Sequence, residues 1–487
     1  MSSSDQPPVD PAAIPTGPEA WLHFAGVGGS GMSALAQFHA QAGGRATGSD
    51  RAFDQGERQE VRDRLEELGI GILPQDGSFA RAWDRPCDAV VVSTAVEDRV
   101  GDIASARKHG IPILHRSELL ARYVAGHRTI AVSGTSGKST VTAMIFAILQ
   151  GCGREPGLLT GGPVGSLMEA GHLGNAWGPG ASTAGDGPPL LVIEADESDG
   201  SLVRYRPWAG VILNLGLDHK SPAEIMDMFR IFRTNVTGPL IVGADANLAE
   251  LAEGNEVFGI DGDDRTGTWA RDVVLLPDGS DFRVDDVSFR LPVPGLYNVK
   301  NAAAAIAACR ACGVDLADMA PALAGFRGVA RRFQPVGIAG GVEVIDDFAH
   351  NPDKIIAAVA AARIRLAGSP GRLLAFFQPH GFGPTRFLRE ALGEAFAACL
   401  HPADILWLPE IYFAGGTVTR DISSADIVAD VRRQGRDARF VPERSDLPAA
   451  IADAARPGDL VLVMGARDPS LTEFCRTILV ALEKSAG

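Results

Sequence analysis

The sequence has no apolar run that approaches the ~20 residues of a membrane-spanning helix, so we expect no membrane span. It is also short of positive charge, because 45 Lys and Arg stand against 60 Asp and Glu, a net charge of -15. An acidic chain is a poor nonspecific binder of nucleic acid or of anionic membranes. We therefore expect neither as a partner, and any phosphate binding must be local.

Cysteine is scarce as well, with six in 487 residues, mostly in apolar surroundings. Such usage is typical of reduced cysteines in a cytosolic protein. Cys309 and Cys312 have C-x-x-C spacing, but they lie in an Ala-rich helical stretch without a second pair, so we expect neither metal nor redox chemistry there. Residues 1–18 are rich in Ser and Pro and lack the regions of a signal peptide, which predicts a disordered tail.

Glycine, by contrast, is abundant, with 57 residues, and many glycines follow short apolar runs. This pattern is typical of α/β proteins, in which glycine turns connect strands to helices. The length corresponds to roughly three domains of about 150 residues each. We expect three α/β domains, which are a Rossmann-like domain over 19–125, a central domain of P-loop type over 126–328 and a C-terminal Rossmann-like domain over 329–487.

The most informative motif lies at 129–140, where a strand of β-branched residues runs into a glycine turn and a helix. The N–H groups of such a turn attract an anion, a lysine adds a full charge, and a hydroxyl can hold Mg²⁺. Only two residues separate Gly134 from Gly137, whereas the usual P-loop has four, so the loop is tighter than that of a generic P-loop NTPase. The expected ATP-binding residues of this loop are Gly134, Thr135, Ser136, Gly137, Lys138, Ser139 and Thr140.

Acidic and polar residues end the next two apolar runs. Glu194, Asp196, Glu197 and Asp199 follow the apolar run at 190–193, and His219 follows the run at 209–213. Carboxylates beside a phosphate loop favour a Mg²⁺ site, because hard cations take oxygen ligands. The alternatives are a solvated acidic turn and a purely structural histidine.

A second glycine turn, at 26–31, follows the short strand expected at 21–25. Asp50 ends the next strand about twenty residues later, where a dinucleotide fingerprint has its ribose-binding acid. A nicotinamide oxidoreductase with an attached ATP-binding module is therefore one hypothesis. Two glycine turns of this kind predict two phosphorylated ligands.

The second half of the chain repeats the pattern of strands that end in polar residues. Asn298 and Asn301 are three apart at the start of an Ala-rich helix, although N-capping alone would explain Asn298. Residues 238–295 are strand-rich, with a hairpin expected at 277–279, and 342–468 alternate as strand and helix, which indicates another parallel sheet. Residues 171–189 are expected to form a mobile surface insertion.

Taken in order, these landmarks resemble the Mur ligase family, and within it the alanine-adding branch. The resemblance runs from about Leu22 to the C-terminus, and its most specific elements are 26–32, 134–140, 194–200, 218–219, 294–301, 331–333, 346–350 and 377–380. It implies that ATP phosphorylates the carboxylate of a UDP-N-acetylmuramate-type substrate. The amine of L-alanine would then attack the acyl phosphate, in peptidoglycan precursor synthesis in the bacterial cytoplasm.

The resemblance also implies roles for single residues. Lys138 would bind the γ-phosphate, Ser139 and Glu194 a first Mg²⁺, and His219 a second. The catalytic residues would be Lys138, Glu194, His219 and His350. Further nucleotide contacts would come from Asn298, Asn301, Arg332 and Asp347, and acceptor contacts from His350, His380 and Arg386. The UDP-sugar would contact Gly26, Gly28, Gly29, Ser30, Gly31, Met32, Asp50 and Ser93. We expect a monomer or homodimer.

Four segments depart from the branch. Ser136 and Ser139 replace the usual residues of the phosphate loop, and Asn351 stands where a second histidine is expected. Segment 381–386 has a single arginine, Arg386, where the branch has arginines that engage substrate carboxylates, and 465–470 differs from the usual Gly-Ala-Gly element. Residues 221–240 contain no lysine for carbamylation, which fits the alanine-adding branch. The departures leave open a specialised or recycling Mur ligase with another amino-acid or peptide acceptor, and a regulatory nucleotide-binding protein without turnover.

Overall fold

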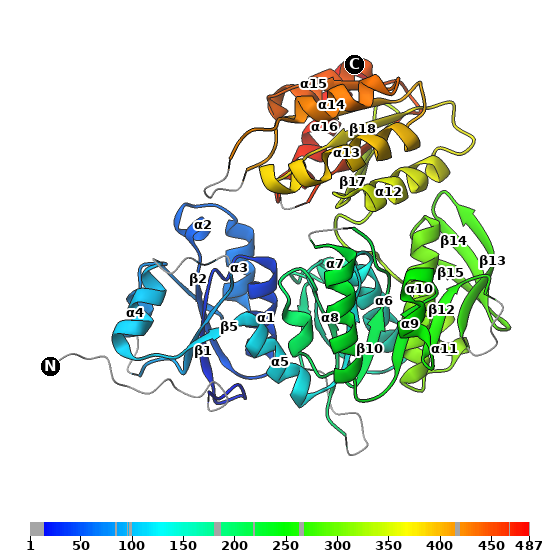
Figure 1. The fold of residues 1–487 in the computed structure, drawn as a ribbon. Helices are drawn as coiled ribbons and strands as arrows, with labels where there is room; N and C mark the ends of the chain where they lie inside the picture. Colours follow the sequence, from blue (N-terminus) through cyan, green and yellow to red (C-terminus); the bar gives the residue numbers. More distant parts are fainter. Residues whose placement is uncertain are drawn as a thin grey trace.

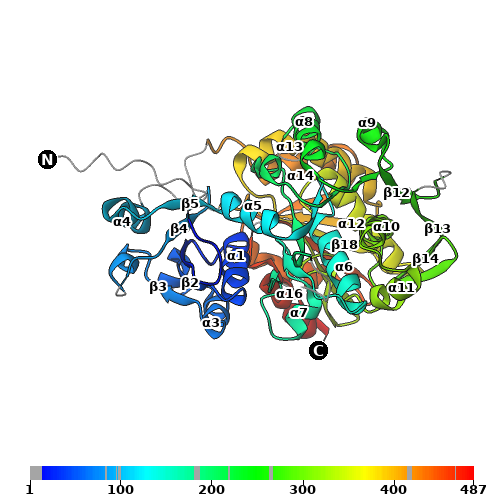
Figure 2. The same ribbon diagram turned by 90° about the horizontal axis from the view of Figure 1, so that it is seen from below.

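Three β-sheets carry the fold, one in each of the three expected domain ranges. The computed structural model describes residues 14–82, 85–94, 96, 100–179, 187–217, 220–262, 267–413, 419–466 and 468–486. In Figure 1 the N-terminal and central parts lie side by side, and the C-terminal part lies above them. The view from below in Figure 2 shows α5 (Arg116–Gly126) running between the N-terminal and central parts.

The N-terminal sheet has five parallel strands in the order β3-β2-β1-β4-β5. This is the strand order of a Rossmann-like half, as expected. The order reverses between β1 and β4, so the glycine turn that follows β1 lies at the switch point, where such sheets bind ligands. The strands are β1 (Trp21–Ala25), β2 (Arg45–Ser49), β3 (Gly71–Leu73), β4 (Ala89–Val92) and β5 (Ile113–His115). The helices are α1 (Ser30–Gln41), α2 (Arg51–Asp54), α3 (Gln59–Glu67), η2 (Ser78–Arg81), α4 (Gly101–His109) and α5.

The central sheet has ten strands in the order β15-β14-β13-β12-β11-β10-β6-β9-β7-β8. Its middle is parallel, and the antiparallel hairpin of β13 and β14 turns at the expected residues 277–279. The strands are β6 (Arg128–Ser133), β7 (Gly157–Leu159), β8 (Ala176–Trp177), β9 (Leu190–Glu194), β10 (Ala209–Ile212), β11 (Leu240–Gly243), β12 (Glu256–Ile260), β13 (Thr268–Leu276), β14 (Gly279–Val284) and β15 (Val287–Leu291). The helices are α6 (Lys138–Gly151), α7 (Gly165–Glu169), η3 (Ser201–Arg204), α8 (Pro222–Asn235), η4 (Ala246–Leu248), α9 (Ala249–Ala252), α10 (Leu296–Ala311) and α11 (Leu316–Ala324).

The C-terminal sheet has the order β16-β17-β21-β18-β19-β20, parallel from β17 onward as expected, with β16 antiparallel at the edge. Its strands are β16 (Gln334–Ala339), β17 (Val342–Asp347), β18 (Leu373–Phe377), β19 (Ile405–Leu408), β20 (Asp437–Phe440) and β21 (Leu460–Met464). Its helices are α12 (Pro352–Arg365), α13 (Phe382–Cys399), α14 (Ser424–Arg433), η5 (Arg444–Asp446), α15 (Leu447–Ala454) and α16 (Leu471–Ala486).

Alternating side chains of the buried strands feed two cores on opposite faces of a sheet. On β6, Ile130 and Val132 pack into one core with α6 and α10, whereas Ala131 packs into the other. That second core continues into the N-terminal domain, where it includes Leu22 and Phe24. The N-terminal and central domains therefore share one apolar core, while the C-terminal sheet has cores of its own on both faces.

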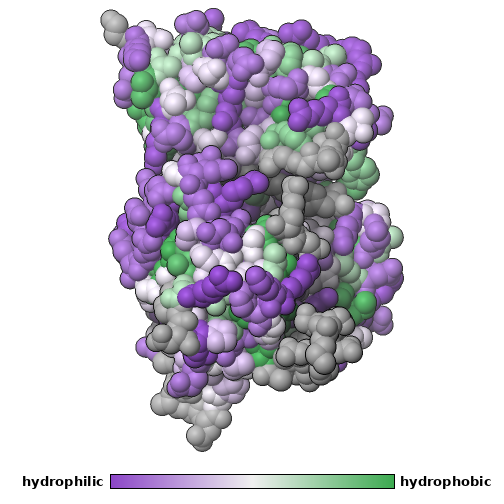
Figure 3. Space-filling model, turned by 90° about the vertical axis from the view of Figure 1, so that its left-hand side faces the viewer, coloured by the Kyte–Doolittle hydropathy of each residue, from purple (hydrophilic) through white to green (hydrophobic). Residues whose placement is uncertain are grey.

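The prediction that residues 1–18 form a disordered tail is wrong for the last residues of this range. Ile14 is buried against the N-terminal core, and its carbonyl oxygen accepts a hydrogen bond of 2.6 Å from Arg122. Residues 1–13, and 180–186 of the expected insertion, lie outside the described residues. Within the described part of the chain, no helix is both long and apolar enough to cross a bilayer. The face in Figure 3 is mostly hydrophilic, with small, scattered hydrophobic areas.

Candidate functional site

The turn between β6 and α6 has the backbone of an anion cradle. Gly134 and Gly137 have φ angles of +140° and +88°, which side chains other than glycine rarely adopt. A Cβ atom on Gly137 would lie 2.6 Å from Asn301 Oδ1, so the turn also needs glycine for space. The N-terminus of α6 follows directly, and its unpaired N–H groups attract negative charge.

Asn214, which follows β10, fixes the shape of this turn from the neighbouring strand. Its Oδ1 accepts hydrogen bonds from Thr135 Oγ1 (2.8 Å) and from the Ser136 backbone N–H (2.9 Å). Its Nδ2 donates to the Ser136 carbonyl oxygen at 2.9 Å. Sequence reasoning named no role for Asn214, although a polar residue just past a strand beside the phosphate loop was the available signal.

Lys138 lies in the turn with its charge already balanced by the acidic cluster. Its Nζ donates to both carboxylate oxygens of Glu197, at 3.0 and 2.9 Å, and to the Gly134 carbonyl oxygen at 2.9 Å. Burial would lower the pKa of Lys138, but the attraction of Glu197, Asp196 and Glu194 outweighs burial and raises it. Lys138 is therefore a permanent cation, and its donors face Glu197 and the Gly134 carbonyl oxygen.

Two of the expected metal ligands, Glu194 at the end of β9 and Ser139 in the first turn of α6, border the same glycine pair. Glu194 Oε2 accepts hydrogen bonds from Thr160 Oγ1 (3.1 Å) and from the Gly161 N–H (2.8 Å). A Cβ atom on Gly161 would lie 3.2 Å from this oxygen, and one on Gly162 would lie 3.4 Å from Ser139 Oγ. The Gly161–Gly162 segment thus borders both Glu194 Oε2 and Ser139 Oγ. Hard cations take oxygen atoms of this kind as ligands.

The third expected ligand, His219, lies outside the described residues, as does Asp218. Among the residues that are described, no cluster of three or more His, Cys, Asp or Glu side chains has the geometry to hold a metal ion. Ser139 and Glu194 supply hard oxygen atoms of the kind that Mg²⁺ takes, so the donor set fits this ion.

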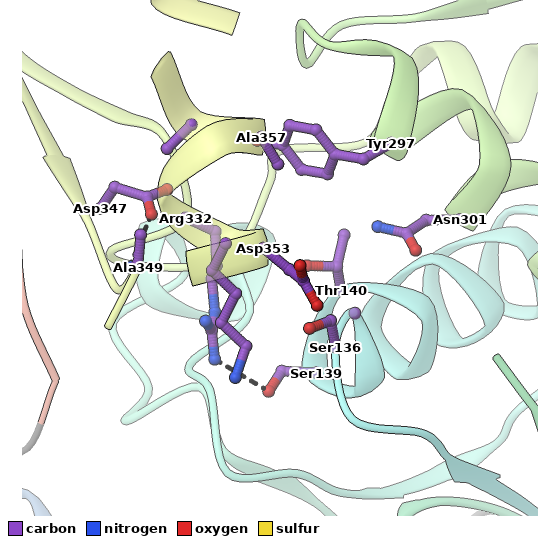
Figure 4. A pocket seen from close by; sticks show the side chains of 13 residues that line it. Ser136, Ser139, Thr140, Tyr297, Asn301, Arg332, Asp347, Ala349, Asp353 and Ala357 are labelled. Carbon is purple, nitrogen blue, oxygen red and sulfur yellow. Dashed lines mark hydrogen bonds between the residues drawn. The ribbon is translucent and has the colours of Figure 1, made fainter. Parts of the chain in front are cut away.

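A cavity of about 130 Å³ lies between the phosphate turn, α10 and the C-terminal domain. Figure 4 shows that its labelled side chains come from all three places. Arg332 Nη2 lies 3.4 Å from Ser139 Oγ, so the segment after the central domain reaches the phosphate turn. The lining residues include Ser136, Gly137, Ser139, Thr140, Tyr297, Asn301, Arg332, Asp347, Asp353 and Lys354. Most of the expected nucleotide-binding residues are thereby brought together, which fits a nucleoside triphosphate.

Asn298 and Asn301 play different parts. Asn301 lines the cavity and faces Gly137. Asn298 is buried and donates to the Pro294 carbonyl oxygen at 2.7 Å, while its Oδ1 accepts from Asn301 at 3.3 Å. The N-cap of α10 is Gly295, so capping does not explain Asn298. Asn298 holds Asn301 in place and is absent from the cavity lining.

Asp347 ends β17 beside Arg332 and is almost completely buried. Its carboxylate accepts backbone hydrogen bonds of 2.7 Å from Phe333 and from Ala349. Burial raises its pKa to about 6, although Arg332 and the two N–H donors act in the opposite direction. Asp347 therefore changes its charge near pH 6.

A second cavity, of about 180 Å³, extends from the acidic cluster to His350 and His380 of the C-terminal domain. It is lined by Lys138, Glu194, Asp196 and Glu197 from the central domain, and by Arg332, Phe348, His350, Lys354, His380 and Ala466. The rings of His350 and His380 lie edge to face with centroids 5.6 Å apart. Burial, then Lys354, holds the pKa of His350 well below its usual range, so this imidazole is neutral at pH 7.

The expected acceptor residue Arg386 is placed elsewhere. It forms an ion pair with Asp421 on an exposed surface of the C-terminal domain and is absent from the lining of both cavities. The altered segment contributes an apolar cluster in which Phe382 packs against Ile411, Ile422 and Phe413. The sequence alone does not reveal that Asp421, thirty-five positions further along, binds this arginine.

Two other departures have structural explanations. Asn351 is buried and caps α12, because its Oδ1 accepts from the Lys354 backbone N–H at 3.0 Å. In segment 465–470, the carbonyl oxygens of Gly465 and Asp468 accept from Arg331, at 2.7 and 3.2 Å. Arg331 also pairs with buried Asp346 at 3.2 Å. These contacts fix the C-terminal domain to the segment that enters it.

The N-terminal glycine turn lies beside Asp50, as expected from the fingerprint. Asp50 Oδ2 accepts from the Gly28 N–H at 2.9 Å, and Oδ1 caps α2 by accepting from the Ala52 N–H. Ser93 lies in the adjoining turn, since its carbonyl oxygen accepts from Val96, whose side chain approaches Gly26.

Two residues that the sequence did not single out tie this turn to the central domain. Arg116 pairs with Asp199 at 2.5 Å, and its guanidinium would lie 2.7 Å from a Cβ atom on Gly31. Asn175 is buried and donates to the Ser30 carbonyl oxygen (2.7 Å) and to Ser33 Oγ (2.8 Å). No sequence pattern identifies pairs this distant along the chain.

The fold and the site define a nucleotide-binding α/β protein of three domains, whose phosphate turn faces residues from a separate C-terminal domain. Three family models match the chain: "Mur ligase family, catalytic domain" over 22–128, "Mur ligase middle domain" over 132–309 and "Mur ligase, glutamate ligase domain" over 331–467. The chain belongs to the Mur ligase family. It is therefore an ATP-dependent ligase by family, and the oxidoreductase hypothesis is wrong.

Relatives and solved structures agree with this family. UDP-N-acetylmuramate--L-alanine ligase of Streptomyces avermitilis is 36% identical and aligns over 95% of this chain and 97% of its own. The corresponding protein of Pelotomaculum thermopropionicum is 35% identical, over 92% and 95%. The crystal structure of UDP-N-acetylmuramate-alanine ligase from Thermotoga maritima matches with a TM-score of 0.75 at 28% identity, covering 96% of this chain and all of that one.

Proposed function

We propose that this protein is an ATP- and Mg²⁺-dependent ligase that joins the carboxylate of UDP-N-acetylmuramate to the amine of L-alanine in peptidoglycan precursor synthesis. The observation that carries the proposal is the cleft between the phosphate turn and the C-terminal domain. It gathers Lys138, Glu194, Arg332 and His350 around one space. Two relatives with this printed activity, at 35–36% identity over nearly the whole chain, support the choice of substrates.

The proposed reaction has two steps. A carboxylate oxygen of the sugar attacks the γ-phosphorus and ADP leaves, and then the amine attacks the acyl carbon and phosphate leaves with loss of one proton. Charge neutralisation and positioning dominate catalysis of such transfers. Lys138 and Arg332 would neutralise the phosphoryl oxygens, and Gly134–Gly137 would hold the phosphates by their N–H groups. Asn301 and Tyr297 would border the nucleoside end, since both line the cavity with Asp347.

The metal that the family implies would bind at Ser139 and Glu194. Mg²⁺ would supply charge neutralisation between phosphate oxygens. The UDP-sugar would bind at the switch point of the N-terminal sheet, along the Gly26–Met32 turn, with Asp50 and Ser93 nearby. We propose that the protein works in the bacterial cytoplasm as a monomer or homodimer, and its six free cysteines suit a reducing compartment.

A second candidate is a ligase with a different acceptor such as a peptide, because the one arginine of segment 381–386 is bound to Asp421 and does not line the cleft. The test mixes the protein with ATP, Mg²⁺ and UDP-N-acetylmuramate, supplies either L-alanine or a peptide that begins with L-alanine, and identifies the product by mass. A product with L-alanine alone supports the first candidate, and a product with the peptide alone supports the second. Binding of ATP without any product would leave a regulatory nucleotide-binding protein.

A further inference from the structure

Lys354 is a cation that lines both cavities of the cleft, yet no part of the proposed function uses it. It shares the first cavity with the phosphate turn, including Gly137 and Ser139, and the second with Lys138 and Glu194. Its neighbour Asp353 also touches the central domain, because a Cβ atom on Gly216 would lie 2.8 Å from Asp353 Oδ2. The first turn of α12 is therefore in contact with the central domain.

The position of Lys354 in its helix aims the side chain at the phosphate turn. Asn351 is the N-cap of α12, so Lys354 is the third residue of the first turn. Side chains on a helix lean toward its N-terminus, and this end of α12 faces the cleft. A cation in the first turn is disfavoured by about 0.3–1 kcal/mol, because the N-terminus of a helix is itself positive. A residue that opposes local stability in this way indicates a functional role.

His350 holds the Lys354 ammonium in a defined place. His350 Nδ1 lies 2.8 Å from the Phe348 carbonyl oxygen, which can only accept, so Nδ1 carries the proton. Nε2 is then an acceptor, and it lies 3.4 Å from Lys354 Nζ. The neutral imidazole thus orients the ammonium without competing for an anion.

We propose that Lys354 is a catalytic residue that contacts the γ-phosphoryl group of ATP during its transfer, and that His350 is the residue that positions it. With Arg332, it brings cationic charge to the cleft from beyond the central domain, while Lys138 lines the same cavity from the central domain. The segment 381–386 cannot do so, since its arginine is bound to Asp421. This inference rests on the proposed function for the identity of the phosphoryl acceptor. The proposed contact between Lys354 and ATP does not depend on that function.

The decisive test compares the affinity of wild type and Lys354→Gln for ADP and for a β,γ-imido analogue of ATP, with Mg²⁺, by calorimetry. We expect Lys354→Gln to bind the analogue about 10-fold more weakly, while ADP affinity changes less than about 3-fold, because only the analogue has the γ-phosphate. Lys354→Arg should retain an intermediate affinity for the analogue. An equal loss for both nucleotides, or no loss, would overturn the proposal.

Turnover gives a second readout. Lys354→Gln should lower kcat roughly 100-fold, the size seen when one charge-stabilising donor is removed, and leave the amino-acid KM within about 3-fold. An effect confined to the amino-acid KM would make Lys354 an acceptor clamp instead and overturn the proposal. If wild type fails to use UDP-N-acetylmuramate, the proposed function fails, and the nucleotide affinities still decide the role of Lys354.

Two controls exclude a general structural effect. Lys108→Gln removes an exposed lysine of α4 and should leave both affinities unchanged. Melting temperatures of wild type and Lys354→Gln, measured first, establish that both proteins are folded when their affinities are compared. His350→Ala should cause the same loss for the ATP analogue, and the double variant should be no worse than either single one. Additive losses would contradict positioning of Lys354 by His350.

Discussion

Lys138 and Glu197 form a buried, two-pronged ion pair, in which Nζ donates to both carboxylate oxygens at 2.9 and 3.0 Å. Glu197 is almost fully buried, and its carboxylate occupies the lysine donors that a γ-phosphate would need. Asp196 lies 3.4 Å from the same Nζ, and Lys138 holds the pKa of Asp196 at about 2 against the effect of burial. A phosphate group that binds Lys138 must therefore displace the Glu197 carboxylate from the lysine Nζ.

Removal of Lys138 alone should destabilise the protein more than removal of both charges of the ion pair. Lys138→Met leaves the Glu197 carboxylate buried without its cation and should lower the free energy of unfolding by about 3–5 kcal/mol. Lys138→Met combined with Glu197→Gln should recover most of that loss, because neither buried group is then charged. Urea unfolding of the four members of this cycle measures the coupling, and ATP turnover should be absent from both variants that lack Lys138. A double variant as unstable as Lys138→Met would contradict the pair.

Gly137 offers a test of the phosphate turn. Gly137→Ala should weaken ATP binding at least 10-fold, because the new Cβ atom would lie 2.6 Å from Asn301 Oδ1 at a φ of +88°. Gly153→Ala is the matched control, since Gly153 has a φ of +72° with nothing within 4 Å of a Cβ atom. Both variants should lose about 1 kcal/mol or more of stability from backbone strain, but Gly153→Ala should keep its ATP affinity. Equal nucleotide binding by the two variants would count against the cradle.

Asp347 gives the protein a pH-dependent stability. Its pKa of about 6 lies above the ordinary 3.8, so the folded protein holds this proton more tightly than the unfolded chain. The resulting contribution is complete below about pH 3.8 and is lost as the pH rises through about 6. Asp347→Asn does not titrate, so the melting temperature of the variant relative to wild type should rise between about pH 4 and pH 7 and then stay constant. A difference that is flat over this range would contradict the raised pKa.

Asn175 tests the contact between the first two domains. Asn175→Ala removes hydrogen bonds to Ser30, Ser33 and Gln37 at the start of α1 and should cost about 1–3 kcal/mol. Because Ser30 lies in the proposed UDP-sugar turn, the KM for the sugar should rise while that for ATP stays constant. Asn255→Ala is the control, since this side chain follows α9 and donates to the nearby carbonyl oxygens of Leu251 and Glu253. An unchanged KM for the sugar would contradict a role of Asn175 in supporting the UDP-sugar turn.

The sequence was sufficient to predict the features that depend on local pattern. Apolar strands that run into glycine turns predicted the sheets and the turn at Gly134–Gly137, because alternation and backbone freedom are local properties. Acids just past β9 predicted the cluster at Glu194 because parallel strands end at one edge of a sheet. The expected nucleotide residues Asn301, Arg332 and Asp347 meet the turn in one cavity.

Features that depend on distant partners could not be read from the sequence. Ile14 was assigned to a tail, but it packs on a core whose residues come from later strands. The family resemblance places Arg386 at the acceptor, but no local pattern reveals its pairing with Asp421. No sequence pattern singles out Lys354 as a functional residue, because only the fold places this lysine beside His350.

The most direct test of the ligase function measures ADP release with ATP, Mg²⁺ and UDP-N-acetylmuramate, with each amino acid in turn and with Lys138→Met as the control. We expect release to depend on both the sugar and L-alanine and to be absent in the control, because transfer needs Lys138 at the γ-phosphate. Release that ignores the sugar, or that persists without Lys138, would contradict the proposed chemistry. Release that needs the sugar but ignores L-alanine would contradict the proposed acceptor.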